Sequence, residues 1–159
     1  MLLLSGLKLI CSTSVNVMAT EASGSLKVTH VVTCFLLRNS RILLLKRSAR
    51  VGTFKGRWAT VSGFIESDDD SQSLIEIEEE IGLLPADLNL KKKGAFLEVD
   101  DASNGVRWII HPYLYRVITD KPIHIDWEHD EFLWIEPTEL GSLETVPGLA
   151  EALSRVYPV

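Results

Sequence analysis

The chain reads GFIESDDDSQSLIEIEEEIGL over Gly63–Leu83, an acidic run with the composition of a helix. Glu76, Glu79 and Glu80 are spaced i, i+3 and i+4, so a helix would place them on one face. Three neighbouring carboxylates repel one another unless positive charge stands between them, and hard divalent cations with oxygen ligands supply that charge. Such ions also bind phosphates or activate water. The stretch therefore predicts a divalent-metal site on a helix.

The ends of this helix can be predicted from its flanking residues. Asp70 or Ser71 is expected to cap a helix over 72–81, and Gly82 is expected to end it. The side chains expected on its inward face are Leu74, Ile77 and Ile81, with the three glutamates on another face.

This stretch resembles the Nudix box, G-x5-E-x7-R-E-U-x-E-E-x-G-U, where U is a bulky aliphatic residue. Glu76–Leu83 fits E-U-x-E-E-x-G-U at every fixed position, and Trp58–Glu66 resembles the usual W-x-x-x-x-G-x-x-E segment before it. The resemblance extends over roughly 28–157. It implies an α/β fold, the Nudix-type α/β/α sandwich with a mixed β-sheet, in which the box forms a loop–helix–loop at the metal site.

The box is degenerate at two places. Ile75 stands where the pattern has arginine, and the segment from Gly63 to Glu76 is two residues shorter than the pattern requires. Counted from Gly63, the upstream glutamate of the pattern falls on Asp69. In the family that glutamate and the arginine tend to pair and support the loop. We therefore expect this support to be absent or rebuilt here.

The resemblance implies a pyrophosphohydrolase that uses metal ions to hydrolyse a diphosphate linkage in a nucleoside diphosphate derivative, either ADP-ribose-like or a nucleoside triphosphate. It implies Glu76, Glu79 and Glu80 as ligands of Mg²⁺, with Mn²⁺ as the alternative ion. The segment from Asp126 to Trp134 resembles a W-E-H-x-E-x-x-W segment of some Nudix domains, a region that often supplies a general base or a further ligand. We therefore predict Glu79 and Glu131 as catalytic residues, with Glu128 as the alternative to Glu131.

Charge is unevenly distributed around the box. Seven basic residues and no acidic one lie in Arg38–Arg57, and eight acidic residues and no basic one lie in Glu66–Glu80. Arginine forks suit phosphate oxygens, so Arg47 and Arg57 are predicted to bind substrate. Glu66 is predicted to contact the metal or the substrate. The alternative is two solvated surfaces of opposite charge.

Hydrophobic patterning predicts the remaining elements of the sheet. The expected strands are 28–37 and 42–45, which form a hairpin around the turn 38–41, then 91–99, 107–117 and 132–135; a last helix is expected over 147–157. Strands with a central acidic helix and a final helix indicate an α/β or α+β domain with a mixed sheet.

Length and composition limit the classes of function. A chain of 159 residues is expected to hold one domain over 26–159, with a flexible N-terminal appendage over 1–25. The net charge of −6 argues against a nucleic-acid binder. The resemblance implies a small-molecule nucleotide as the partner. No membrane partner is expected, and a homodimer is left open. The chain is expected to be cytoplasmic, with organelle targeting by residues 1–17 as the alternative. Its two cysteines form no framework, and Cys34 is expected to be a buried thiol.

Two other functions compete with hydrolysis. One is a nucleotide-sensing module with little or no turnover, which the missing arginine and shortened loop favour. The other is an isopentenyl-diphosphate isomerase-like enzyme, which is disfavoured because Ser62-Gly63 stands where that chemistry needs a cysteine. If an aromatic residue stacks on a nucleobase, Trp127 or Phe96 is the expected one.

Overall fold

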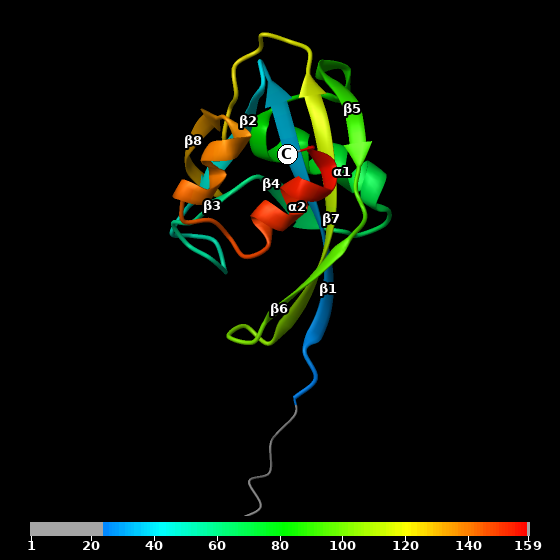
Figure 1. The fold of residues 1–159 in the computed structure, drawn as a ribbon, viewed down its shortest axis with the longest axis vertical. Coiled ribbons are helices and arrows are strands. Elements are labelled where there is room, and N and C mark those ends of the chain that lie inside the picture. The colour runs from blue at the N-terminus through cyan, green and yellow to red at the C-terminus, as the bar shows by residue number, and fades with distance from the viewer. Residues whose placement is uncertain (1–23, 159) are drawn as a thin grey trace, which may run out of the picture.

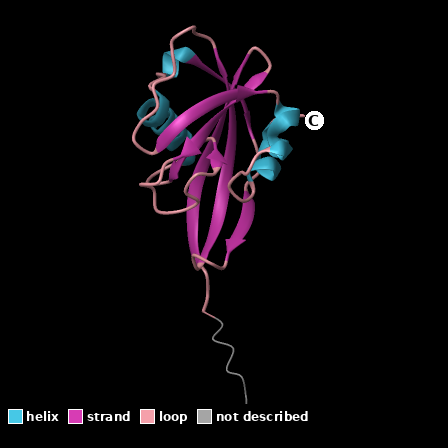
Figure 2. Ribbon diagram, turned by 90° about the vertical axis from the view of Figure 1, so that its left-hand side faces the viewer, coloured by secondary structure: helices cyan, strands magenta, loops and turns pink. Residues whose placement is uncertain are grey.

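This computed structural model describes residues 24–158. Its strands pair into one mixed sheet, and helices lie on both faces of the sheet (Figures 1 and 2). Residues 1–17, which include Cys11 and for which organelle targeting was an alternative, lie outside the described residues. The strands are β1 (Lys27–Arg38), β2 (Arg41–Arg47), β3 (Trp58–Ala59), β4 (Val61–Phe64), β5 (Leu88–Lys93), β6 (Leu97–Asp101), β7 (Val106–Val117) and β8 (His129–Ile135). The helices are α1 (Asp69–Ile81) and α2 (Leu149–Val156), with 3-10 turns η1 (Pro85–Asp87) and η2 (Pro137–Ser142).

Two long parallel strands form the centre of the sheet. β1 pairs with β7 in parallel from Lys27↔Val106 to Leu37↔Arg116, and the main strand order is β3-β2-β1-β7-β5. The other pairings are antiparallel, with β4 against β1, β6 against β7, and β8 against β2. This combination confirms the predicted mixed sheet.

The β1–β2 hairpin turns at the predicted place. Asn39 and Ser40 have φ values of 51° and 63°, so both central residues are left-handed. Two-residue turns of this kind match the right-handed twist of the strands that they join, and asparagine tolerates the conformation well.

The single strand expected over 91–99 is instead two strands, β5 and β6, which pair with successive parts of β7. Gly94 lies at the break, and its N–H donates to the Pro112 carbonyl at 2.9 Å. A Cβ at Gly94 would stand 2.9 Å from the Val156 side chain of α2. The close passage of α2 therefore requires glycine here, and the break in the strand follows from tertiary packing.

Helix α1 begins three residues earlier than the sequence predicted. Asp68 caps it by accepting the Ser71 N–H at 2.8 Å, and Lys93 of β5 contacts Asp69 and Asp70 at 3.0 and 2.9 Å. These contacts extend the first turn beyond the predicted start. The predicted end is confirmed, since Gly82 adopts φ 76° and donates its N–H to the Glu78 carbonyl.

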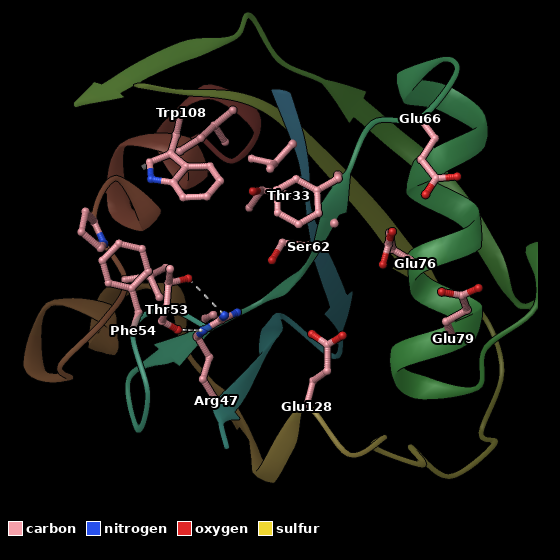
Figure 3. A pocket seen from close by; sticks show the side chains of 17 residues that line it. Thr33, Arg47, Thr53, Phe54, Ser62, Glu66, Glu76, Glu79, Trp108 and Glu128 are labelled. Atoms are coloured by element: carbon pink, nitrogen blue, oxygen red, sulfur yellow. Dashed lines mark hydrogen bonds between the residues drawn. The ribbon is translucent and has the colours of Figure 1, made fainter. Parts of the chain in front are cut away.

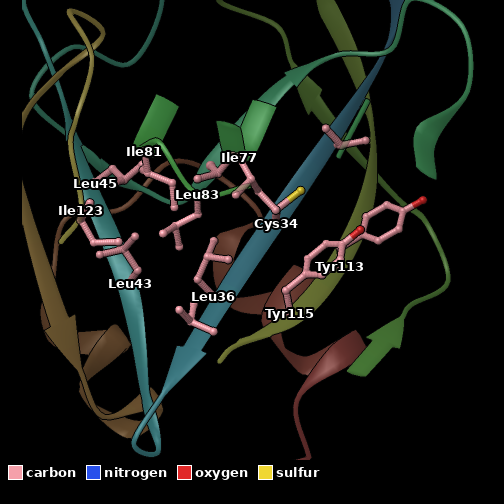
Figure 4. Packing of buried hydrophobic residues seen from close by; sticks show 13 residues of the cluster. Cys34, Leu36, Leu43, Leu45, Ile77, Ile81, Leu83, Tyr113, Tyr115 and Ile123 are labelled. Atoms are coloured by element: carbon pink, nitrogen blue, oxygen red, sulfur yellow. The ribbon is translucent and has the colours of Figure 1, made fainter. Parts of the chain in front are cut away.

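Two clusters of buried apolar side chains hold the helices to the sheet. One lies between the sheet and α1 and includes Cys34, Leu43, Ile77 and Tyr113 (Figure 4). The other lies on the opposite face, where α2 and η2 pack against side chains such as Phe35. The helix–sheet–helix layering confirms the predicted α/β/α sandwich. Cys34 is fully buried, as predicted, and burial raises the pKa of its thiol.

Candidate active site

A pocket of about 310 Å³ opens beside the acidic helix α1 (Figure 3). Its other side is an aromatic wall formed by Phe54, Phe64 and Trp108. The residues that line the pocket are Val31, Thr33, Arg47, Thr53, Phe54, Ala59, Ser62, Gly63, Phe64, Glu66, Glu76, Glu79, Trp108, Ile110, Glu128, Val146 and Pro147. Carboxylates gather on the side of α1, Phe54 and Trp108 lie opposite, and Arg47 lies between them. The pocket thus offers anionic, cationic and aromatic groups within one small volume.

Four carboxylates line this pocket. Glu76 and Glu79 come from α1, Glu66 from the loop before it, and Glu128 from the loop before β8. The structure therefore brings together three of the carboxylates predicted from the sequence and adds the alternative, Glu128.

Gly63 leaves room for the carboxylate of Glu76. A Cβ built on Gly63 would stand 2.0 Å from the Glu76 carboxyl carbon, far inside van der Waals contact. Gly63 pairs with Val32 of β1 within the sheet, so its backbone is fixed. Glycine at this position thus allows the Glu76 carboxylate to lie where it does.

Gln72 connects the loop before α1 to Glu76. Its Nε2 donates to Glu76 Oε1 at 2.8 Å, and its Oε1 accepts the Glu66 N–H at 3.3 Å. Ile75, at the position of the box arginine, is 44% exposed instead. The glutamate–arginine pair that supports the loop in the family was expected to be absent or rebuilt. Here the loop is supported in another form, because the buried neutral amide of Gln72 links it to the helix.

Glu80 is buried, although the sequence placed it on the glutamate face. Helical spacing sets it beside Ile77, three residues earlier and at the core, so only 3% of Glu80 is exposed. The Ser62 N–H donates to Glu80 Oε1 at 3.2 Å, whereas Oε2 has no hydrogen-bond partner among the described residues. His129 Nε2 lies 3.6 Å from that oxygen, and His129 Nδ1 lies 3.1 Å from Asp126 Oδ1.

The environment of Glu76 and Glu80 opposes their ionisation. Burial raises the pKa of Glu76, and the charges of Glu79, Glu128 and Glu66 add to the rise against the Gln72 hydrogen bond. Burial also raises the pKa of Glu80 well above its ordinary value, with the charge of Glu76 contributing. A group of neighbouring acids with raised pKa values is a common sign of a functional site.

Arg47, predicted to bind substrate, lines the pocket. Its Nε donates to the Thr53 carbonyl at 2.9 Å, which fixes the guanidinium at the pocket edge (Figure 3). Burial lowers the pKa of Arg47, and the charges of Glu128 and Glu80 oppose that shift. Arg57, predicted alongside it, is exposed and donates to the Thr145 carbonyl at 3.1 Å without lining the pocket.

Glu131 lies outside the pocket, in contrast to its predicted catalytic position. It is exposed and pairs with Lys46 at 2.6 Å. Glu131 faces Lys46 in the regular register of β2 and β8, and a bulge lies next to this pair, because Arg47 pairs with His129 and one residue of β8 is skipped. Bulges redirect side chains, and here Glu128 enters the pocket while Glu131 does not. Burial raises the pKa of Glu128.

The aromatic wall was missed by the sequence interpretation. Phe64 and Trp108 lie with ring centroids 6.3 Å apart, and Phe54 adopts a left-handed φ of 51°. Of the aromatic residues favoured from the sequence, Trp127 lies under the guanidinium of Arg50 and Phe96 lies at a tilt beside His111, and neither lines the pocket. Phe54 comes from a loop and Trp108 from β7, so no local sequence pattern shows that the two line one pocket.

The described part of the chain holds no ready-made metal centre. Across residues 24–158 no three His, Cys, Asp or Glu side chains converge closely enough to hold an ion as they stand. Within the same span, no helix has the length and apolarity needed to cross a membrane.

Comparison with known proteins identifies the family. A model of the NUDIX domain matches residues 28–156, so the chain belongs to the Nudix family. The box helix, the pocket that it lines and this match agree on an enzyme of the pyrophosphohydrolase class, acting in general on nucleotide diphosphate linkages. A search of curated proteins gave no significant match.

Solved structures share the fold at low sequence identity. An Ap4A hydrolase of C. elegans in a binary complex has a TM-score of 0.66 and 14% identity, covering 80% of this chain and 93% of that chain. A MutT protein from Methanosarcina mazei Go1 has a TM-score of 0.67 and 17% identity, covering 82% and 93%. A bifunctional NMN adenylyltransferase/ADP ribose pyrophosphatase from Francisella tularensis, complexed with AMP and a Mn ion, has a TM-score of 0.64 and 22% identity, covering 81% and 41%.

Proposed function

We propose that this chain uses divalent metal ions, Mg²⁺ or Mn²⁺, to hydrolyse the diphosphate of a small nucleotide, either an ADP-ribose-like compound or a nucleoside triphosphate. The observation that supports this most is the division of one pocket into a carboxylate side and an aromatic side, with Arg47 between them. A nucleotide diphosphate has the matching order of parts, an aromatic base followed by anionic phosphates.

The carboxylates fit divalent ions by their chemistry. Glu76, Glu79 and Glu80 would hold the ions, and Glu128 is available as a further ligand. Two observations favour this. One buried oxygen of Glu80 has no hydrogen-bond partner among the described residues, and burial, together with the charges of neighbouring carboxylates, raises the pKa values of Glu76 and Glu80. When bound, such ions neutralise diphosphate oxygens and acidify water.

Arg47 would bind a phosphate of the substrate. Its Nε is occupied by the Thr53 carbonyl, so the guanidinium is oriented before substrate arrives. A partly desolvated guanidinium makes short, charge-assisted hydrogen bonds to phosphate oxygens. Arg57 does not line the pocket, so it has no role in this proposal.

The aromatic wall would hold the base of the nucleotide. Phe54 and Trp108 present ring surfaces, and Thr33 adds a hydroxyl, in a pocket of the size that small ligands occupy. Ring stacking tolerates different bases, so this wall favours nucleotides as a class without selecting one.

Glu128 is the better candidate for general base, and it replaces Glu131 in the proposal. A base works best when its pKa lies near the operating pH, and burial moves the pKa of Glu128 upward from the ordinary glutamate value. Glu79 remains a catalytic candidate, because it lines the pocket on the exposed side of α1.

An isomerase function receives no support from the site. Cys34 is fully buried among the side chains that pack under α1, and burial raises the pKa of its thiol. A thiol of this kind is unreactive, whereas a catalytic cysteine needs access and a lowered pKa.

The test is product analysis with a panel of nucleoside diphosphate derivatives and triphosphates in the presence of Mg²⁺. The native chain should convert at least one compound into two phosphorylated products or into a nucleotide and pyrophosphate. Glu79→Gln should abolish this conversion, and Glu78→Gln, which alters an exposed glutamate of the same helix, should leave it intact. Nucleotide binding without products from any compound would instead support the sensing function.

A further inference from the structure

Gln72 occupies an unusual place for a polar side chain, because it is 6% exposed and contacts two parts of the pocket wall. Its amide donates to Glu76 at 2.8 Å and accepts the backbone N–H of Glu66 at 3.3 Å. Glu66 and Glu76 both line the pocket and come from different segments, the loop and the helix. A single side chain therefore connects two carboxylate-bearing segments of the site.

Chemistry fixes the orientation of this amide. The Glu66 N–H can only donate and an ionised Glu76 can only accept, so the amide oxygen must face the loop and the NH₂ group must face the carboxylate. The spacing of Gln72 and Glu76, i and i+4 on one helix, keeps the donor and acceptor adjacent. A flip of the amide would break both hydrogen bonds in a nearly dry environment, where an unpaired polar group is costly.

We propose that Gln72 is a positioning residue that sets the place of the Glu76 carboxylate relative to the Glu66 loop, and with it the geometry of the cation site. The inference rests on the proposed metal-dependent function of the pocket. In this proposal Gln72 does not touch the substrate or the ions, and it acts on them only through the position of Glu76.

A neutral amide suits this task in a site that must bind cations. It holds Glu76 through Oε1, and no other residue in the described part of the chain hydrogen-bonds Oε2, so that oxygen is available to an ion. It also adds no positive charge, so it does not compete electrostatically with a bound cation. The hydrogen bond is therefore compatible with metal binding at the same carboxylate.

The test replaces Gln72 in the full chain and measures Mn²⁺ binding directly, by the loss of the free Mn²⁺ signal in electron paramagnetic resonance. Gln72→Met keeps the length and removes both hydrogen bonds. Gln72→Asn keeps an amide but is one methylene shorter, and it covers the case in which the methionine variant fails to fold. Both should weaken Mn²⁺ binding and lower kcat by roughly 10-fold to 100-fold, the usual effect of losing a group that orients a metal ligand. KM should change less than kcat.

Glu78→Gln serves as the matched control on the same helix, because its side chain is exposed and lies off the pocket. If Gln72→Met or Gln72→Asn is less stable but binds Mn²⁺ within twofold of the native chain, the residue is merely structural and the inference is overturned. If the native chain itself neither binds Mn²⁺ nor hydrolyses any nucleotide, the proposed function fails and the inference fails with it. These two failures are distinguished by the native protein alone.

Discussion

Gly63→Ala should damage the site while leaving the fold nearly intact. The added methyl group would stand 2.0 Å from the carboxyl carbon of Glu76, whereas ordinary contact begins at 3.4 Å. The obstructing atoms are the far end of a flexible side chain, so Glu76 can rotate away and the sheet need not move. The carboxylate must then shift by about 1.4 Å, the difference between these two distances, and it would leave the Gln72 hydrogen bond.

The expected loss of activity follows from that displacement. A misplacement of about 1 Å at a catalytic site can reduce the rate roughly 100-fold, so kcat with Mg²⁺ and a nucleotide substrate should fall by about that factor. The free energy of unfolding should change by less than about 1.5 kcal/mol, since no backbone shift is required. Steady-state kinetics and urea unfolding, run on the same preparations, measure the two effects.

Gly52→Ala is the matched control for this experiment. Among residues 24–158, no atom lies within 4 Å of a Cβ added at Gly52, and its φ is not left-handed, so its substitution should be silent in both assays. The reasoning is refuted if Gly63→Ala keeps native kcat, because the Glu76 position would then not matter. It is also refuted if Gly63→Ala unfolds, because the strain would then be in the sheet.

Three further outcomes test other parts of the site. Glu128→Gln should lower kcat at least 100-fold if it is the general base, whereas Glu131→Gln, outside the pocket, should stay within about twofold; the reverse order would rule out the bulge explanation. Glu80→Gln should raise the free energy of unfolding of the metal-free protein above pH 4.5, the ordinary glutamate pKa. Burial raises the pKa of Glu80 in the folded state, so the native protein loses stability as the pH rises from the ordinary pKa through the folded-state pKa, and the glutamine variant does not. That gain is worth about 1.4 kcal/mol for each unit of pKa shift, and urea unfolding in EDTA at several pH values would detect its absence. Arg47→Lys should raise KM roughly 10-fold with a smaller change in kcat, since lysine lacks the planar fork; an unchanged KM would exclude phosphate binding by Arg47.

Local signals made the acidic helix and its end predictable. The i, i+3, i+4 spacing of the glutamates and the glycine at 82 act within a few residues, so the sequence displays them directly. The burial of Glu80 was missed because three carboxylates were treated as one exposed face. Helical geometry alone, with Ile77 three residues earlier, would have set Glu80 toward the core.

The pocket as a whole depends on tertiary contacts that no short segment specifies. The exposed place of Glu131 and the bulge beside Glu128 both depend on the pairing of β8 with β2, strands more than eighty residues apart. The aromatic wall combines Phe54 from a loop with Trp108 from β7, and neither segment carries a sign of the other. The role of Gln72 likewise appears only when the loop folds back on the helix.

The parallel pairing of β1 with β7 has a consequence for how the protein is made. Its first matched residues, Lys27 and Val106, are separated by 79 positions, and the pair forms the centre of the sheet. A growing polypeptide must therefore hold the apolar strand β1 without its central partner until β7 has left the ribosome. Closing so long a loop is entropically unfavourable and tends to slow folding. We expect nascent chains that end before Val106 to depend on chaperones and to aggregate when released early.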